Sequence, residues 1–147
     1  MPFSRNVHIL IADDDVDDCL LIKDAFESSK IGNSINFVHD GEQLVRYLRR
    51  MQPYDDSVNH PMPGLILLDL NMPLKDGREA LTEIKADEKL RSIPIIILTT
   101  SSSEEDVANS YADGVNSFIT KPVTFTGLQN VVKGISRYWL EIVELPD

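Results

Sequence analysis

Five short apolar runs alternate along this chain with segments of helical periodicity. The apolar runs lie at 7–12, 35–38, 65–70, 93–98 and 117–120. Helical patterns lie between them at 16–28, 41–51 and 77–86, and a last one begins at Phe125. The strict alternation of strand and helix is typical of βα units, which build a parallel sheet with helices on both faces. The chain is therefore predicted to be an α/β protein.

Size and charge limit the function classes. The 147 residues, 42% of them hydrophobic, suffice for one well-buried core, so we expect a single domain over 1–147. The net charge of −10 disfavours direct binding to nucleic acid, which depends on cations that replace counterions around phosphates. No apolar run approaches the roughly 18 residues needed to span a membrane, and the first six residues lack the apolar core of a signal peptide. The single cysteine, Cys19, excludes an intramolecular disulfide, and we expect a cytoplasmic protein.

Local signals mark the ends of several helices. Asp40 with Gln43, and Ser102 with Glu105, have the spacing of a capping box, which satisfies free N–H groups in the first turn. Gly32 is expected to follow the end of the first helix. The polar, proline-rich stretch 52–64 is predicted to be an exposed loop longer than usual.

Charged side chains follow three of the predicted strands. Asp69 ends the strongest apolar run, an acidic triplet at 13–15 follows the first run, and Lys121 follows the fifth. The carboxyl ends of parallel strands meet at one edge of an open sheet, where such folds bind ligands. We therefore expect one small cavity to be surrounded by Asp13, Asp14, Asp69, Thr99 and Lys121.

Such a group of residues favours phosphoryl chemistry. Crowded carboxylates would repel one another unless a cation lay between them, and hard oxygen ligands suit Mg²⁺. Beside a metal and an ammonium, Asp69 stays ionised and can attack a phosphoryl group to form an aspartyl phosphate. The metal and Lys121 would neutralise charge on the transferred oxygens.

The same residues, taken in order, resemble a known family. Their combination resembles the receiver domain of two-component response regulators over about 7–139, and it comprises Asp13-Asp14, Asp69 followed by Asn-Met-Pro and Gly77, Thr99, and Lys121-Pro122. The resemblance implies a flavodoxin-like, doubly wound sheet of five parallel strands in the order 2-1-3-4-5.

The family pattern also implies a role for each matching residue. Asp69 resembles the phosphoacceptor, and the ligands of Mg²⁺ would be Asp14, Asp69, the backbone carbonyl of Asn71 and, through water, Asp13. Thr99 and Phe118 resemble the switch pair, while Lys121 would pair with the phosphate. Phe118 has no phenolic hydroxyl, so an aromatic switch here must work by packing. The resemblance further implies a cis bond between Lys121 and Pro122, and Gly77 is expected to give the backbone conformational freedom.

Two regions suggest a narrower group. The loop 52–64 and the ending at 138–146 resemble stand-alone regulators that pair with bacterial and cyanobacterial phytochrome-type sensor kinases. This resemblance implies a sensor histidine kinase as phosphodonor, a homodimer, and output through a downstream protein or a phosphotransfer partner. A helical extension is expected at about 136–147. The first part of the last helix is expected to pack on the sheet through Leu128, Val131, Val132 and Ile135. An apolar stripe toward its end is expected to overrun the sheet and supply the dimer surface, at Ile135, Tyr138, Trp139, Ile142 and Val143.

Two other functions would use some of the same residues. A Mg²⁺-dependent phosphohydrolase with an aspartyl nucleophile would also need clustered carboxylates and a lysine, and the triplet 13–15 contains the Asp-x-Asp spacing of such enzymes. These enzymes normally need a larger chain or a cap to bind substrate. A receiver fold that only binds partners is disfavoured because no site residue is missing. Asp15 is expected to cap a helix and Asp76 to shape a turn.

Overall fold

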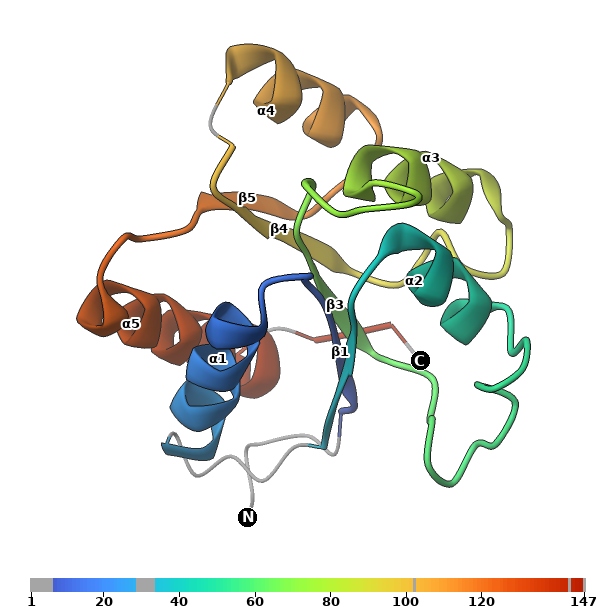
Figure 1. Ribbon diagram of the computed structural model, residues 1–147, viewed down its shortest axis with the longest axis horizontal. Coiled ribbons are helices and arrows are strands. Elements are labelled where there is room, and N and C mark those ends of the chain that lie inside the picture. Colours follow the sequence, from blue (N-terminus) through green and yellow to red (C-terminus); the bar gives the residue numbers. More distant parts are fainter. Residues whose placement is uncertain (1–6, 29–33, 102, 143, 147) are drawn as a thin grey trace.

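The computed structural model describes residues 7–28, 34–101, 103–142 and 144–146, and Figure 1 shows a central sheet with helices on both sides. The sheet has five parallel strands in the order β2-β1-β3-β4-β5, as predicted. Their bounds are β1 Ile9–Ala12, β2 Ile35–Val38, β3 Leu65–Leu68, β4 Ile95–Thr99 and β5 Ser117–Thr120.

The helices form two layers. Helices α1 and α5 pack against each other on one face of the sheet, and α2 packs beside α3 on the other, with α4 next to β5 (Figure 1). The bounds are α1 Val16–Ser28, α2 Gly41–Leu48, α3 Gly77–Ala86, α4 Glu104–Ala112 and α5 Phe125–Ile135, which continues into a π-helical segment, η1, Ser136–Ile142.

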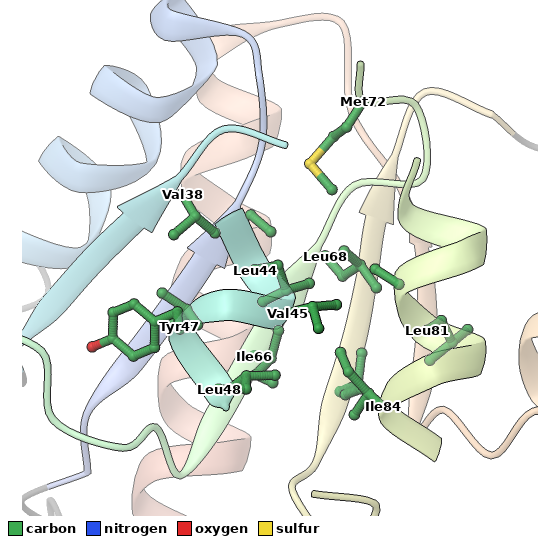
Figure 2. Close-up of a cluster of buried hydrophobic side chains, with 14 of the residues drawn as sticks. Val38, Leu44, Val45, Tyr47, Leu48, Ile66, Leu68, Met72, Leu81 and Ile84 are labelled. Atoms are coloured by element: carbon green, nitrogen blue, oxygen red, sulfur yellow. The ribbon is translucent and has the colours of Figure 1, made fainter. Parts of the chain in front are cut away.

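Strand β3 shows how the sheet is buried on both faces. Leu65 and Leu67 join the cluster beneath α1 and α5, whereas Ile66 and Leu68 join the cluster beneath α2 and α3. Figure 2 shows the second cluster, in which Ile66 and Leu68 meet side chains of α2 and α3. Because successive side chains of a strand point to opposite faces, a strand covered on both sides has an unbroken aliphatic run.

Some of the predicted helix ends are confirmed and others moved. Asp40 caps α2 by accepting a hydrogen bond from Gln43 N at 2.7 Å, and the Gln43 side chain accepts one from His39 N at 2.7 Å. Helix α2 ends at Leu48, three residues earlier than predicted. Gly32 lies outside the described residues.

The start of α4 is capped by Ser103, whose hydroxyl accepts from Asp106 N at 3.1 Å. The predicted cap, Ser102, lies outside the described residues.

The C-terminal stripe does not lie wholly beyond the sheet. Ile135 is buried in the cluster beneath α1 and α5, and Trp139 packs against that cluster. Tyr138 is exposed, with 54% of its surface accessible. Ile135 thus packs in the core, as expected of the first part of the helix, and its place in the predicted dimer stripe was wrong. The side chain of Ile142 and all of Val143 lie outside the described part.

Hydrogen bonds hold the long loop before β3 near the amino ends of the strands. The Tyr47 hydroxyl donates to Pro61 O at 2.7 Å and lies 3.2 Å from His8 Nε2. Across the described ranges, no helix combines the length and the apolar character that a membrane span requires.

Candidate functional site

The predicted site residues meet at the carboxyl ends of four neighbouring strands. Asp13 follows β1, Asp69 follows β3, Thr99 ends β4 and Lys121 follows β5. Backbone hydrogen bonds keep these strand ends in register, from Asp69 N to Ala12 O at 2.9 Å and from Lys121 N to Thr99 O at 2.7 Å. The sheet therefore brings together residues from four separate parts of the sequence.

Lys121 is the buried cation of this site. Its Nζ lies 2.6 Å from Asp13, 2.8 Å from Asp18 and 3.1 Å from Asp69, and its side chain is 4% exposed. Asp18 was not predicted to belong to the site. The available signal was its place in the first turn of α1, directly after the acidic triplet. One ammonium is thus shared by three carboxylates.

Burial and charge oppose each other in this cluster. Burial alone would lower the pKa of Lys121, but hydrogen bonds to Asp13 and Asp18 and attraction to Asp69 outweigh it, so the pKa lies above its usual range. Burial raises the pKa of Asp13 to about 6, although the hydrogen bond from Lys121 acts in the opposite direction. The lysine remains charged at neutral pH, but its hydrogen bond does not fully offset the effect of burial on the pKa of Asp13.

Three carboxylates are close enough to share a metal ion. One oxygen atom from each of Asp13, Asp14 and Asp69 can be chosen so that all lie within 4.8 Å of one another. Asp13 and Asp69 are buried, whereas Asp14 is exposed and faces solvent. A hard divalent cation with several oxygen ligands and room for water fits this donor set. Its positive charge would complete the compensation of the Asp13 carboxylate.

Asp69 is held by contacts to both of its side-chain oxygens. Oδ1 accepts from Thr99 Oγ1 at 2.6 Å and from Asn71 N at 3.2 Å, and Oδ2 accepts from Lys121 Nζ at 3.1 Å. Thr99 is fully buried, so few positions are open to its hydroxyl. The arrangement orients a carboxylate nucleophile beside a hydroxyl and an ammonium.

Phe118 lies on the neighbouring strand β5. Its side chain is partly buried and packs against the cluster beneath α2 and α3. Its backbone N–H donates to the hydroxyl of Tyr111 on α4 at 3.1 Å, a link that the sequence did not indicate. The strand is therefore attached to α4 near the proposed switch aromatic.

Gly77 is required for a different reason from the one expected. Its φ is not positive; among the described glycines, a positive φ occurs at Gly114. A Cβ on Gly77 would overlap the carbonyl oxygen of Asp69 and lie 2.6 Å from Leu70 Cα. Glycine thus lets the start of α3 approach the backbone of Asp69. Asp76 caps this helix, as expected of a turn residue, by accepting from Glu79 N at 3.0 Å.

The expected cis bond at Lys121-Pro122 was wrong. In the described part of the chain the cis peptide bond is Gln52–Pro53. Lys121 reaches its three carboxylates with a trans bond, which is the favoured geometry before proline.

Asp15 serves as a local cap, as expected. Its Oδ1 accepts from Asp18 N at 3.1 Å in the first turn of α1. This contact uses the carboxylate within its own helix and leaves Asp13 and Asp14 as the acidic pair of the site.

Comparison with known sequences identifies the pattern. The profile of the response regulator receiver domain matches residues 9–133. Response regulator Rcp1 of Synechocystis sp. is 41% identical over 138 residues, which cover 94% of this chain and 92% of Rcp1. The "Probable methanogenesis regulatory protein FilR2" of Methanothrix harundinacea is 38% identical over 132 residues, covering 90% and 83% of the two chains.

Solved structures agree with this match. The Mn²⁺-bound form of Rcp1 has a TM-score of 0.89 at 40% identity and covers 96% of this chain and 99% of that one. The phosphorylated cyanobacterial phytochrome response regulator RcpA has a TM-score of 0.89 at 41% identity, with the same coverage. The similarity extends over all five strands and so includes every strand end that contributes to the site.

Proposed function

The chain belongs to the response regulator receiver domain family, and on that premise we propose that Asp69 accepts a phosphoryl group from a sensor histidine kinase in a Mg²⁺-dependent phosphorelay. The observation that carries the proposal is the position of Asp69, whose two oxygens contact the buried Lys121 ammonium and the Thr99 hydroxyl. A carboxylate in this position can attack phosphorus while the nearby cation stabilises the transferred oxygens.

The step is an in-line displacement. An Asp69 oxygen forms the new O–P bond while the phosphorus–nitrogen bond to the donor histidine breaks, and the bonding electrons leave with the imidazole. Lys121 lies on the Oδ2 side of Asp69 and would pair with a phosphoryl oxygen. Because its pKa is raised, Lys121 contributes a positive charge throughout the neutral pH range.

The acidic residues fit a divalent ion. Asp14, Asp69 and the backbone carbonyl of Asn71 would hold Mg²⁺, and Asp13 would hold a water bound to it. The ion, when bound, neutralises charge on the transferred group. The raised pKa of Asp13 supports this assignment, because a buried carboxylate that is incompletely paired gains from a further cation.

Output would follow from repacking rather than from turnover of a substrate. The Thr99 hydroxyl, now bonded to Asp69, would turn to a phosphoryl oxygen, and Phe118 would repack behind it. The protein would then be a phosphoacceptor that catalyses only its own phosphorylation and dephosphorylation. We assign a single receiver domain to 1–147, with a C-terminal extension at about 136–147, and a downstream protein or phosphotransfer partner as the target.

The pathway is a narrower proposal. A phytochrome-type kinase is supported by the similarity to RcpA, a phytochrome response regulator. FilR2 is almost as similar in sequence but is named as a probable methanogenesis regulatory protein, so similarity to receiver domains alone does not identify the kinase. We also propose a homodimer and a cytoplasmic location; the exposed Tyr138 supports the first, and the unpaired, buried Cys19 is consistent with the second.

The phosphohydrolase alternative is disfavoured by local contacts. Asp13 is paired with Lys121 at 2.6 Å, and Asp15 caps α1. Asp69, by contrast, accepts from both the Thr99 hydroxyl and the Lys121 ammonium, and neither end of the Asp-x-Asp triplet has this pair of contacts.

Chemical phosphorylation tests the proposal. Phosphoramidate with Mg²⁺ should raise the intact mass by one phosphoryl group, and peptide mapping should locate that group on Asp69. Asp69→Asn should give no stoichiometric product. Modification of Asp13 or Asp14 instead would overturn the assignment. Phosphotransfer from a panel of purified sensor kinases, phytochrome-type kinases included, then tests the pathway.

A further inference from the structure

Arg78, near the start of α3, forms an ion pair with Asp106 of α4. Its Nε donates to Asp106 Oδ1 at 2.7 Å and its Nη2 to Asp106 Oδ2 at 2.6 Å. This two-pronged geometry is the one in which arginine and carboxylate fix each other's orientation. The Asp106 side chain is 14% exposed and that of Arg78 is 40% exposed, so the carboxylate is shielded from water more than the guanidinium is. Neither residue was predicted to have a role.

The pair extends towards Asp69 along one path through the loop after β4. Asp106 Oδ2 also accepts from the Ser101 hydroxyl at 2.5 Å. Ser101 N donates to Thr99 Oγ1 at 3.4 Å, and that hydroxyl donates to Asp69 Oδ1 at 2.6 Å. The start of α4 is thus connected to the phosphoacceptor through the proposed switch residue.

A second path runs through the loop after β3. Arg78 Nη1 donates to Asn71 Oδ1 at 3.4 Å, and Asn71 N donates to Asp69 Oδ1 at 3.2 Å. Both paths end on the same atom, Asp69 Oδ1. The hydrogen bonds therefore form a closed ring of six residues, namely Asp69, Thr99, Ser101, Asp106, Arg78 and Asn71.

The hydrogen bonds of the ring differ in length: those around Asp106 are short, and two others are long. The contacts among Arg78, Asp106 and Ser101 are 2.5–2.7 Å long, whereas Arg78 meets Asn71, and Ser101 meets Thr99, at 3.4 Å. Short contacts between charged groups hold geometry, and long contacts yield first. A movement of Thr99 would open the ring at Ser101 without breaking the ion pair.

We propose that Arg78 and Asp106 are positioning residues for phosphoryl acceptance, which hold the loops of Asn71 and Thr99 in place on the two sides of Asp69. The proposal rests on the proposed function, because Asn71 would supply a backbone carbonyl to Mg²⁺ and Thr99 would follow the phosphoryl group. An ion pair that served only to join α3 to α4 would affect stability but neither metal affinity nor phosphorylation.

The test compares Arg78→Gln, Asp106→Asn and the double variant with a matched control, Arg49→Gln. Arg49 also pairs with carboxylates of the α3 region, Glu83 at 3.7 Å and Asp87 at 3.8 Å, but it lies outside the ring. For each protein we would measure the Mg²⁺ dissociation constant by calorimetry, the phosphorylation rate with phosphoramidate at saturating Mg²⁺, and amide hydrogen exchange over 103–112.

Arg78→Gln should weaken Mg²⁺ binding about tenfold and slow phosphorylation by a similar factor, the lower end of the range for residues that orient a metal ligand. It should also speed amide exchange at the start of α4. Because the two residues act as one unit, the double variant should be no worse than Arg78→Gln alone. The Arg49→Gln control should match the wild type in all three measurements.

Two results would overturn the proposal. One is a lower melting temperature with unchanged Mg²⁺ affinity and phosphorylation rate per folded molecule, which would make the pair a structural link only. The other is additive loss in the double variant. The metal titration and the exchange measurement use unphosphorylated protein, so they remain decisive if Asp69 itself proves not to be the phosphoacceptor.

Discussion

The Lys121 ammonium lies 3.1 Å from Asp69 Oδ2, although the two residues are 52 positions apart in the chain. Strand β4 lies between the two strands that Asp69 and Lys121 follow, and it pairs in parallel with β3 on one side and with β5 on the other. The two registers bring the ends of β3 and β5 to the same edge of the sheet and so produce this contact. The same ammonium is 2.6 Å from Asp13. Under the proposed function, Lys121 would therefore compete with a metal ion for the same carboxylates and also assist the chemistry of Asp69.

This double role predicts that Lys121→Met lowers the phosphorylation rate and raises the affinity for Mg²⁺. Loss of the cation should slow phosphorylation by phosphoramidate by about 100-fold or more, the usual effect of removing one group that stabilises developing charge. Affinity for Mg²⁺ should rise, because the carboxylates then lack their internal counter-charge. Calorimetric titration and intact-mass kinetics measure the two effects separately. A fall in Mg²⁺ affinity would mean that Lys121 supports the metal site instead.

Thr99→Ala should separate chemistry from signalling. The variant keeps Asp69, Lys121 and the acidic pair, so it should still be phosphorylated on Asp69. The hydroxyl that contacts Asp69 Oδ1 at 2.6 Å would be gone, so the changes in α4 and β5 that follow phosphorylation should be lost. Amide spectra with and without phosphorylation would report this. A variant that accepts no phosphoryl group would place Thr99 in the catalytic set.

The strand ends could be predicted from sequence because their placement depends on a general rule. Once the apolar runs are recognised as parallel strands, Asp13, Asp69 and Lys121 must share one edge of the sheet. Side chains that reach the site from helices have no such rule. Asp18 contacts Lys121 across 103 positions, and Arg78 of α3 contacts Asp106 of α4. In sequence, Arg78 and Asp106 are indistinguishable from ordinary surface charges, and Asp18 is marked only by its place in a helical turn that follows the acidic triplet.

The C-terminal helix shows the same limit in another form. Its apolar spacing predicts a buried face, but spacing cannot say where the sheet ends, and so it assigns Ile135 both to the core and to the stripe beyond it. The π-helical segment begins at Ser136, directly after the buried Ile135. Which stripe residue is covered is decided by tertiary packing.

Gly77→Ala should damage fold and function together. The added methyl group would overlap the carbonyl oxygen of Asp69, so α3 or the end of β3 must shift. Overpacking of this kind costs about 1–3 kcal/mol of unfolding free energy, and the shift would also displace Asp69. Urea denaturation and phosphorylation kinetics should both change. Gly134→Ala is the matched control, because a Cβ at Gly134 meets no heavy atom within 4 Å. Wild-type stability in Gly77→Ala would contradict the predicted clash.

Tyr138 and Trp139 should affect different properties. Tyr138 is 54% exposed, so Tyr138→Ala should weaken self-association, by about thirtyfold if the ring is an interface anchor worth about 2 kcal/mol. Trp139 packs on the cluster beneath α1 and α5, so Trp139→Ala should lower the unfolding free energy instead. Sedimentation and urea denaturation distinguish these effects, with and without phosphorylation. A wild type that stays monomeric at tens of micromolar in both states would remove the homodimer proposal and leave Tyr138 available to another partner.

His8 should make stability depend on pH. The ring is buried between the Ser34 hydroxyl, 2.6 Å from Nδ1, and the Tyr47 hydroxyl, 3.2 Å from Nε2, and burial lowers its pKa below the ordinary 6.5. Because the unfolded chain takes up this proton more readily than the folded one, the contribution of His8 is fully present above pH 6.5. It is lost as the pH falls from there through the lowered pKa of the folded state.

His8→Gln removes this titration while retaining a polar side chain. The unfolding free energy, measured by urea denaturation between pH 7.5 and pH 5, should fall less in the variant than in the wild type. The comparison between the two proteins matters because burial raises the pKa of Asp13 to about 6, so Asp13 also titrates in this range, and it does so in both proteins. Burial raises the pKa of Tyr47 to about 12, so its hydroxyl stays neutral across the whole range and adds no proton of its own. Parallel curves for wild type and variant would show that the His8 ring is protonated as easily inside the fold as outside it.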